Sequence, residues 1–555
     1  FFFGSMSRLG TFLRKSPKYI FGAATISGGA YLYQWKSFEF FFDEPHPEDK
    51  PRLVVLGTGW AAMSLLSEID CEKYNVSIVS PRNYFVFTPF LPCTTVGTIE
   101  WNHCIESVRR VLFRFRKRAK YYEAAASDID FENNKVTCSD VLKKDDDPTK
   151  SFELPYEQLV IALGADNNTF NTKGVYEHAT FLKSLEDAKA IRKRILNNFE
   201  QAALPSTTEE ERRRLLHFVI VGGGPTGVEF AAELHDYVHD DLSKYFAKEC
   251  KKYLKITIVE GMDRVLNAFD KEIAKYTQEK FKRNGVEVIT KTFVTGVGGE
   301  TIDFMDARTK ERTTHPHGLV VWATGITTKP VVKGFMSKLG THQKNARALT
   351  VDGRLTVKGC TNVYGIGDCS TIQCEKLETL LDSLWNQQEY VKDGGLTFET
   401  FQKFVADHRK QHVQLDFLGD RLEQLFEKHD TEKNALLSKS EFKKLIQEAD
   451  SKITALPPTA QVAAQQGSYI AQRLNHLGDT RHSVMPFAYN HRGSFAYVGS
   501  DEAVYDSDMI KLKGGAAFWG RNTAYLSKLF SWESKRNIMW DLFWSKWFGR
   551  DIATY

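Results

Sequence analysis

The stretch Arg52-Leu53-Val54-Val55-Leu56-Gly57-Thr58-Gly59-Trp60-Ala61-Ala62 decides the fold of this chain. Its apolar residues predict a short buried strand, and the spacing of apolar residues after Ala62 predicts a helix. The Gly-x-Gly-x-x-Ala turn between them is typical of a Rossmann phosphate site. Gly57 would permit the tight turn, and Gly59 would let the backbone approach a pyrophosphate at the helix N-terminus.

The same pattern returns about 165 residues later, which makes a chance match improbable. Residues His217–Val221 predict a strand, and Gly222, Gly224 and Gly227 then fill all three glycine positions of the fingerprint. We expect the following helix to run from Thr226 to about Lys252.

The next predicted strand, Ile256–Val259, ends at Glu260, where a Rossmann unit places its ribose-binding acid. A carboxylate there would accept hydrogen bonds from both ribose hydroxyls and would repel a 2′-phosphate, which favours NADH over NADPH. Arg264 nearby leaves that preference open. In the first unit the strand Val76–Val79 ends instead at Ser80, which weakens that site taken alone.

Two buried strands, Gln158–Ala165 with Gly164 and Gly318–Ile326 with Gly325, are each expected to close one nucleotide unit. The segment Asn362–Cys369 is similar to the strand and loop in which an aspartate, here Asp368, meets a flavin ribityl chain and pyrophosphate. The alternative is an ordinary acid in a turn. These elements predict an α/β chain with two Rossmann-like dinucleotide-binding domains.

Composition excludes several classes of protein. The 555 residues include 74 basic and 70 acidic side chains, so the net charge of +4 gives no reason to expect nucleic acid as a partner. The eight cysteines form no Cys-x-x-Cys pair, which argues against a zinc cluster or a thioredoxin-like dithiol. Cys369 and Cys374 have a spacing that could serve redox chemistry or simply fill a core.

The N-terminal segment is basic and free of acids up to Glu39, which looks like a mitochondrial transit segment or its remnant. Within it, the 17 residues from Tyr19 to Trp35 carry no charge. That length is short for a membrane span, so one transmembrane helix, an interfacial segment and a presequence all remain open.

From about Pro51 onward the chain resembles a type II (alternative) NADH:ubiquinone oxidoreductase, in an EF-hand-containing mitochondrial form. Beyond the glycine motifs, the resemblance rests on Val79–Phe85 with Thr88–Pro92, on Trp322–Ile326 and on Thr459–Gly467. Members of this family also carry Ser-Pro-Arg after the second strand, which accounts for Ser80. Cys93 has no partner close by, unlike the paired redox cysteines of the glutathione-reductase relatives.

The resemblance implies that FAD lies between two substrates and passes electrons from NADH to a membrane ubiquinone, without pumping protons. It assigns FAD to Gly57, Gly59, Ala62, Ser80, Arg82, Gly164 and Asp368, and NADH to Gly222, Gly224, Gly227, Glu260 and Gly325. The catalytic candidates are Glu229, Gln461 and Gln465, with Ala460 beside the quinone head group. Glu229 could instead be an ordinary helix-face carboxylate, and the two amides could merely cap or bridge helices.

The tail from Phe518 to Phe548 holds ten aromatic residues interspersed with basic ones such as Arg521. Trp540, Phe543, Trp544 and Trp547 recur at helical spacing and form one aromatic stripe. Such a stripe beside lysine and arginine suits a bilayer interface, so we expect an amphipathic C-terminal membrane-anchoring region. A core helix or a dimer contact is the alternative, and the family implies a homodimer. The enzyme would then sit peripherally on the mitochondrial inner membrane.

A charged insert before Pro457 contains a loop with the ligand spacing of an EF-hand. Position 6 of the loop is Ala435, where a sharp turn usually requires glycine. Alanine at this position is expected to cost about 1 kcal/mol of backbone strain. Asp393–Phe398 reads as a degenerate partner loop, whose twelfth position is Thr400. Calcium binding and a purely structural EF-hand pair remain alternatives. The six candidate ligands are Asp430, Glu432, Asn434, Leu436, Ser438 and Glu441.

These expectations divide the chain into seven segments. They are an N-terminal presequence remnant (1–50), an FAD-binding domain in two parts (51–210 and 336–382), an NADH-binding domain (211–335), a helical EF-hand-like insert (383–450), the quinone-site helix with the return to the FAD domain (451–515), and a C-terminal membrane-anchoring and dimer region (516–555).

Two other functions compete with this one: a sulfide:quinone type of flavin reductase, and a calcium-sensing membrane scaffold without catalysis. Glu260 argues against the first and the intact glycines against the second.

Overall fold

The computed structural model describes residues 50–553, apart from 116–117, 247–251, 374–376, 379–380, 382–384, 386–389, 392–393, 409–414, 416–421, 453–455, 480–484 and 508. The basic N-terminal segment with its uncharged run, Cys250, Cys374 and Asp393 lie outside the described residues.

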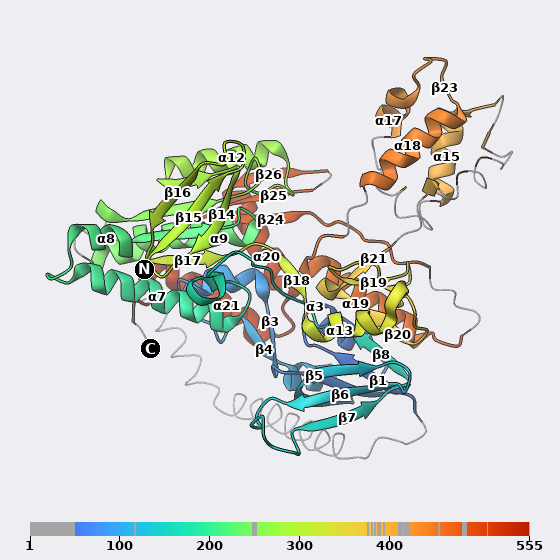
Figure 1. Cartoon of the computed structure of the whole chain (residues 1–555), viewed down its shortest axis with the longest axis horizontal. Coiled ribbons are helices and arrows are strands. Elements are labelled where there is room, and N and C mark those ends of the chain that lie inside the picture. Colours follow the sequence, from blue (N-terminus) through green and yellow to red (C-terminus); the bar gives the residue numbers. More distant parts are fainter. Residues whose placement is uncertain are drawn as a thin grey trace, which may run out of the picture.

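The first sheet has seven strands in the order β20-β8-β1-β2-β5-β6-β7 (Figure 1). β1 (Arg52–Leu56), the strand predicted by the opening stretch, is an interior strand of this sheet. β1 pairs in parallel with β2 on one side and β8 on the other, whereas β5, β6 and β7 are joined antiparallel. The other strands are β2 (Asn75–Ser80), β5 (Ala119–Asp130), β6 (Lys135–Asp140), β7 (Ser151–Pro155), β8 (Gln158–Ile161) and β20 (Val363–Gly365).

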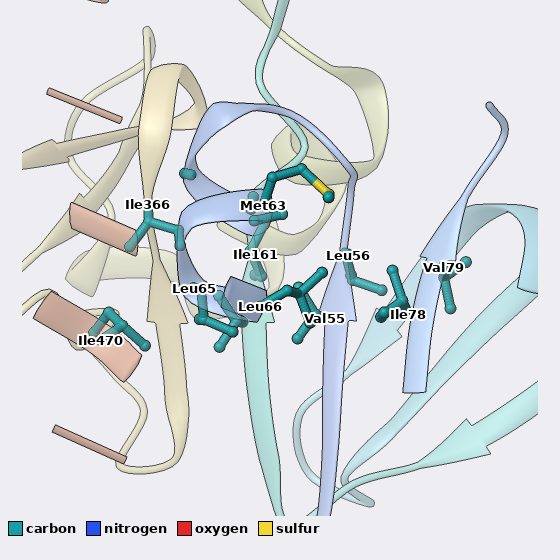
Figure 2. Packing of buried hydrophobic residues seen from close by; sticks show 14 of the residues in the cluster. Val55, Leu56, Met63, Leu65, Leu66, Ile78, Val79, Ile161, Ile366 and Ile470 are labelled. Carbon is teal, nitrogen blue, oxygen red and sulfur yellow. The ribbon is translucent and has the colours of Figure 1, made fainter. Parts of the chain in front are cut away.

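Two helices pack together at this sheet, α3 (Trp60–Glu68) and α19 (Ala460–Asn475). They approach closely because Gly467 has no side chain: a Cβ there would lie 2.1 Å from the carbonyl oxygen of Ala61. Figure 2 shows Leu65 of α3, Val55 of β1 and Ile470 of α19 in one buried cluster. This packing places α19 beside the first glycine turn, although the two lie about 400 positions apart in the sequence.

α19 begins after the two prolines Pro457 and Pro458. Thr459 is the N-cap, and its side chain accepts a hydrogen bond from the N–H of Val462. Both prolines therefore precede the helix, because a residue followed by proline is disfavoured in helical conformation.

The second sheet has five parallel strands in the order β10-β17-β11-β12-β13. The predicted strand His217–Val221 is confirmed as β11, and all five of its residues are buried. The other strands are β10 (Thr180–Phe181), β12 (Lys255–Val259), β13 (Val286–Ile289) and β17 (Leu319–Trp322). Helices associated with this half of the chain are α7 (Leu185–Ala203), α8 (Glu209–Leu215), α9 (Pro225–Tyr237) and α12 (Lys271–Arg283).

The prediction that one α-helix runs from Thr226 to Lys252 is wrong. α9 ends at Tyr237, and a wider π-helical turn, η2 (Val238–Leu242), and the single turn α10 (Ser243–Tyr245) follow it. The break lies where buried Asp241 and Tyr237 contact the C-terminal segment, so tertiary contacts override the local helical pattern.

Each predicted closing strand is interrupted at its glycine. Gly164 and Gly325 have positive φ angles of 66° and 74°, which end β8 and β17 before the chain continues. The chain then forms β9 (Ala165–Asn167) and β18 (Ile326–Thr328), which pair antiparallel with each other. The two nucleotide units are therefore joined by a short two-stranded ribbon.

Smaller elements surround these sheets. A three-stranded antiparallel sheet flanks the second unit, and two-stranded pairs flank the first. The strands are β14 (Thr292–Val297), β15 (Thr301–Asp306), β16 (Arg312–Pro316), β3 (Tyr84–Val86), β4 (Ile105–Ser107), β19 (Leu349–Val351) and β21 (Ser370–Ile372). The helices and single turns are α4 (Leu91–Thr94), α5 (Val108–Arg114), α6 (Val175–His178), α13 (Pro330–Leu339), η1 (Thr88–Phe90), η3 (Gly340–His342) and η4 (Gly367–Cys369).

The insert and the C-terminal region complete the chain. The insert projects away from both large sheets (Figure 1) and has its own apolar core, with α15 (Phe398–His408), α17 (Leu422–His429), α18 (Lys439–Lys452), β22 (Leu396–Thr397) and β23 (Leu436–Leu437). The C-terminal region has β24 (Ser494–Gly499), β25 (Glu502–Asp506), β26 (Lys511–Gly514), α20 (Gly515–Lys528) and α21 (Trp532–Phe548). No helix among the described residues has both the length and the hydropathy needed to cross a bilayer.

Candidate functional site

The first glycine turn follows β1 and has the shape of a phosphate cradle. Gly57 has a φ of 109°, and a Cβ there would lie 2.3 Å from the carbonyl oxygen of Ala162. Gly59 is the N-cap of α3 and has no atom within 4 Å of its Cβ position, while Ala62 is buried within the helix. The turn therefore combines a tight backbone with open space at a helix N-terminus, which suits a pyrophosphate.

Ser80 ends β2 and orders the neighbouring loop. Its hydroxyl lies 2.9 Å from the Thr58 hydroxyl and accepts a hydrogen bond from the N–H of Arg82 at 3.3 Å. Ser80 is buried, whereas Arg82 is exposed and leaves its guanidinium free to reach a ligand. A hydroxyl pair thus joins the first glycine turn to the end of β2.

Asp368 lies in η4, just beyond β20 and beside the first turn. Gly367 has a φ of 72°, and its Cβ position lies 3.4 Å from Ala61 of α3. Burial raises the pKa of Asp368, and the charge of Lys183 opposes that rise. A half-buried carboxylate at this position can accept hydrogen bonds from the hydroxyls of a bound ribityl chain.

The second glycine turn follows β11 and repeats the geometry of the first. Gly222 has a φ of 113°, and a Cβ at Gly227 would lie 2.0 Å from the Gly222 carbonyl oxygen. Gly224 is the N-cap of α9, with no atom within 4 Å of its Cβ position. Gly325 belongs to the loop that follows β17, and a Cβ there would lie 2.6 Å from the ring of Phe170.

Glu260 lies at the carboxyl end of β12, beside the second turn. Its carboxylate accepts hydrogen bonds from the N–H of Gly223 at 2.6 Å and from the N–H of Met262 at 2.8 Å. The carboxylate therefore stands where the ribose of a dinucleotide on this turn would lie. Arg264 makes only a long hydrogen bond, 3.4 Å to the Asn267 carbonyl oxygen, and its buried Nε has no hydrogen-bond partner in the described part of the chain.

Glu229 lies on α9 and is almost completely buried. Its Oε1 accepts hydrogen bonds from the Tyr497 N–H at 3.0 Å and from Arg521 Nη2 at 3.0 Å and Nε at 3.2 Å. Burial raises the pKa of Glu229, while Arg521 and the Tyr497 N–H lower it. Glu229 is therefore not an ordinary exposed carboxylate on a helix face.

The ion pair between Arg521 and Glu229 corrects the expectation that groups Arg521 with the basic residues of the tail that face the bilayer. Arg521 is on α20, yet only 2% of it is exposed, because its guanidinium packs between Glu229 and the rings of Tyr497 and Tyr525. Buried guanidinium groups need such partners. Its basic character alone could not distinguish this position from the exposed Lys528 or Arg536.

Gln461 and Gln465 lie on one face of α19, as their spacing predicts. The Gln461 carboxamide bonds to Arg492 N–H and the Gly493 carbonyl, while Gln465 bonds both backbone groups of Asn490. In this state both amides hold the segment 489–493 against the helix, in the bridging manner considered above. Ala460 is the first residue of α19 and is half-buried.

Gln466 is a site residue that sequence reasoning missed. It is 2% exposed, and its Oε1 accepts a hydrogen bond from the Gly367 N–H at 2.7 Å. This bond ties α19 to the loop that carries Asp368. The sequence offers little indication of this role, because helical spacing places Gln466 on the core-facing side of α19, where an apolar residue is expected.

The insert loop 430–441 is closed by hydrogen bonds from its own backbone. Asp430 accepts hydrogen bonds from the N–H groups of Asn434 and Ala435, and Ala435 has a φ of 58°, the conformation for which glycine is usual. Leu436 and Leu437 pair antiparallel with Leu396 and Thr397, as the loops of an EF-hand pair do. The candidate ligands Glu432 and Ser438 lie in the same loop.

Glu441, the twelfth position of that loop, is engaged within the protein. It is 3% exposed and accepts hydrogen bonds from Thr431 and Ser438, which lower its pKa to about 2. Among the described residues, no group of three or more His, Cys, Asp or Glu side chains is arranged to hold a metal ion. A cation at this loop would require Glu441 to exchange these partners for metal coordination.

The cysteines in the described part of the chain are not joined in disulfides. The six in the described part of the chain are free thiols, and burial raises the pKa of Cys104 to about 12 and that of Cys369 to about 11. Cys93 is also buried, and burial raises its pKa well above the ordinary value. Thiolates are the reactive form, so dithiol relay chemistry is disfavoured here.

α21 buries three residues and exposes most of its aromatic residues. The buried residues are Ser534, Ile538 and Asp541, and Asp541 lies 2.6 Å from His103 Nδ1. The predicted stripe is exposed, with exposed fractions of 56% for Trp540, 47% for Phe543 and Trp544, and 70% for Trp547. A contiguous aromatic surface of this kind marks an interaction surface.

Comparison with known proteins agrees with this geometry. The family described as pyridine nucleotide-disulphide oxidoreductase matches residues 51–387, and the NDH2 C-terminal domain matches residues 491–551. The chain is 39% identical to an external alternative NAD(P)H-ubiquinone oxidoreductase B1, mitochondrial, of Solanum tuberosum, over 95% of each chain. It is 34% identical to an external alternative NADH-ubiquinone oxidoreductase, mitochondrial, of Yarrowia lipolytica, over 92% of this chain and 81% of that protein.

A solved structure is similar as well. NDH2 from Plasmodium falciparum in complex with NADH is 31% identical, with a TM-score of 0.81, over 91% of this chain and all of that one.

Proposed function

This chain belongs to the type II NADH:ubiquinone oxidoreductase family, and on that premise we propose that it transfers reducing equivalents from NADH to a membrane quinone without pumping protons. One observation carries the proposal: two glycine turns, each next to a helix N-terminus and open space, lie at the carboxyl ends of parallel-paired strands in two separate sheets. Two dinucleotides can thus be held by one chain.

The residues of the first turn fit FAD. Gly57, Gly59 and Ala62 would hold its pyrophosphate, Ser80 and Arg82 its adenosine side, and Gly164 and Asp368 the ribityl side. A bound flavin would supply the chemistry, accepting a hydride from NADH and returning two electrons to quinone. The protein contributes position and charge.

The residues of the second turn fit NADH. Gly222, Gly224 and Gly227 would admit its pyrophosphate to the N-terminus of α9, Glu260 would bind the ribose hydroxyls, and Gly325 would form part of the loop at the nicotinamide end. Glu229 lies one turn into the same helix. Its buried carboxylate would act electrostatically on the flavin or nicotinamide ring bound between the two turns.

The quinone head group is assigned to the start of α19. Ala460 supplies a small residue, and Gln461 and Gln465 supply amide donors once their bonds to the segment 489–493 are exchanged for bonds to a ligand. Gly467 sets α19 against the first turn, so a ligand at these amides lies near the flavin site.

An anaerobic titration tests the function. Stoichiometric NADH is expected to bleach the oxidised-flavin band near 450 nm, and a short-chain quinone is expected to restore it. A Gln461→Leu variant should keep its flavin and its reduction by NADH, while reoxidation by quinone slows about 10-fold or more, the loss expected when a donor to a reacting group is removed. Gln472→Leu, on the same helix but about three turns from its start, is the matched control. A colourless protein, or bleaching that quinone does not reverse, would contradict the proposal.

We further propose peripheral attachment to the mitochondrial inner membrane through α21 and homodimer formation through the C-terminal region. The exposed aromatic surface of α21 and its neighbours Lys535 and Arg536 support the first, because indole rings and basic groups suit the lipid head-group layer. The mitochondrial names of the relatives support the location. A basic N-terminal transit segment is proposed on the same grounds.

Calcium binding at the loop 430–441 is proposed for the insert, as a modulator of the oxidoreductase. The positive φ at Ala435 and the pairing of β22 with β23 support it, since both belong to a calcium-competent loop. In calorimetry on the whole chain, Asp430→Ala is expected to weaken calcium binding at least about 10-fold, because it removes the first-position carboxylate. Glu427→Ala, an exposed acid on α17, should have no effect. Equal binding by parent and Asp430→Ala, or no binding by the parent, would leave the EF-hand pair a structural module.

A further inference from the structure

Segment 489–493 presents two hydrogen-bond donors to one oxygen of Gln461. The Tyr489 hydroxyl donates to Gln461 Oε1 at 3.1 Å, and the Arg492 N–H donates to the same oxygen at 2.7 Å. A carboxamide oxygen and a quinone oxygen are both carbonyl acceptors with two lone pairs. When the amide of Gln461 turns away, a ligand carbonyl that takes the place of Oε1 would therefore meet both donors.

A second side chain of this segment continues the hydrogen bonds toward solvent. His491 Nδ1 lies 3.1 Å from the Tyr489 hydroxyl oxygen, and the centroids of the two rings are 5.9 Å apart. Because the hydroxyl gives its one hydrogen to Gln461, its oxygen is left to accept the Nδ1 hydrogen of His491. Tyr489 is half-buried and His491 is exposed, so the connection runs from water to the amide.

Bonds outside α19 hold the segment on both sides of this pair. Before it, the N–H of buried Phe487 donates to the Gly353 carbonyl oxygen at 2.7 Å. At its other end, the Tyr505 hydroxyl donates to the Arg492 carbonyl oxygen at 3.1 Å. Neither bond involves the amides of α19, so the segment stays anchored when those amides turn toward a ligand.

We propose that Tyr489 is the proton donor to the quinone oxygen and that His491 is the positioning residue that returns a proton to it. The inference rests on the proposed function. Transfer of two electrons from NADH to a quinone yields NAD⁺ and quinol, and it consumes one proton from water in each turnover. The connection from His491 through Tyr489 to the position of Gln461 Oε1 supplies a route for that proton.

Each step of the route breaks one bond and forms one. As the quinone is reduced by the two electrons from NADH, the Tyr489 O–H bond breaks and an O–H bond forms at the quinone oxygen. The Tyr489 oxygen then takes the Nδ1 proton of His491, and His491 Nε2 takes a proton from water. Burial raises the pKa of Tyr489, although a hydrogen bond with Thr459 opposes the rise, so the hydroxyl stays protonated until the quinone accepts charge.

The test follows the flavin-loaded protein, reduced beforehand with NADH, while a short-chain quinone reoxidises it. Tyr489→Phe is expected to slow reoxidation at saturating quinone about 100-fold, the contribution typical of a general acid, while KM for quinone changes far less and bleaching by NADH is unaffected. A hydroxyl that merely held the segment would act on KM for quinone instead. Tyr176→Phe, at an exposed position on α6, is the control, and flavin content reports folding.

His491→Gln tests the second half of the route. It is expected to slow reoxidation about 10-fold, because water replaces the imidazole only in part, and added imidazole should restore the rate. His342→Gln, an exposed histidine of η3, is the control. In the parent protein, reoxidation should be slower in D₂O than in H₂O while bleaching by NADH should not, because only reoxidation moves a solvent proton.

Four results would overturn the inference. They are a parental rate of reoxidation in Tyr489→Phe, a loss in that variant confined to KM for quinone, a parental rate in His491→Gln, and a loss in His491→Gln that imidazole does not restore. A parent protein that NADH bleaches and quinone does not recolour would refute the proposed function instead, so the two failures are distinguishable.

Discussion

Replacement of Arg521 by methionine is expected to lower the free energy of unfolding by about 3–5 kcal/mol, because it leaves the buried charge of Glu229 without its partner. Arg521 Nη2 and Nε lie 3.0 Å and 3.2 Å from the same carboxylate oxygen, and both residues are nearly inaccessible to water. Arg521 also ties α20 to α9, so its loss should loosen the C-terminal region first. Equilibrium denaturation of the flavin-loaded protein measures the change.

The pH dependence separates this explanation from lost packing. Burial raises the pKa of Glu229 in the folded protein, and removing Arg521 raises it further. A folded state that binds an extra proton loses stability as pH rises, so the deficit of the variant should be larger at about pH 8 than at about pH 5. The double variant Arg521→Met with Glu229→Gln should recover part of the loss, and Arg536→Met, at an exposed position, should change little. A deficit independent of pH, unrelieved in the double variant, would rule out the stranded charge.

Replacement of Gly57 by alanine is expected to abolish flavin retention. The new Cβ would lie 2.3 Å from the Ala162 carbonyl oxygen, at a φ of 109° that side chains rarely adopt. Strain of about 3 kcal/mol corresponds to affinity about 100-fold weaker, so the purified protein should be colourless and inactive with NADH and quinone. Absorbance near 450 nm and the flavin released on denaturation measure the result.

The equivalent change in the second turn is the matched comparison. Gly222→Ala would place a Cβ 2.8 Å from the Ala323 carbonyl oxygen. This variant should stay yellow yet fail to bleach with NADH. If Gly57→Ala retained its flavin, or if Gly222→Ala lost it, the assignment of the two cofactors to the two turns would be wrong.

The sequence predicted the two nucleotide units well because their signals are local. A strand, a glycine turn and a helix follow one another within about 20 residues, and β11 has the predicted bounds. The two closing strands end earlier than predicted, at Ile161 and Trp322, and the positive φ angles of Gly164 and Gly325 turn the chain into the ribbon between the two units.

What the sequence could not predict depends on distant contacts. Arg521 lies 292 positions from Glu229, and nothing local distinguishes it from arginines on the surface. Gln466 and Gly367 are 99 positions apart, and the bond between them appears only after α19 has packed on α3. The early end of α9 at Tyr237 likewise follows from contacts with the C-terminal segment and not from helix propensity.

The attachment of α21 at both ends has a consequence for any encounter with lipid. Glu106 accepts hydrogen bonds from the N–H groups of Phe530 and Ser531 before the helix, and Arg550 reaches Thr98 and Asp241 after it, each at 2.9 Å. Under the proposed membrane attachment, the aromatic surface would be assembled before it meets a bilayer and would lose little chain entropy there, unlike a tail that folds as it adsorbs. The orientation of the body toward the lipid would then be set by how α21 is held.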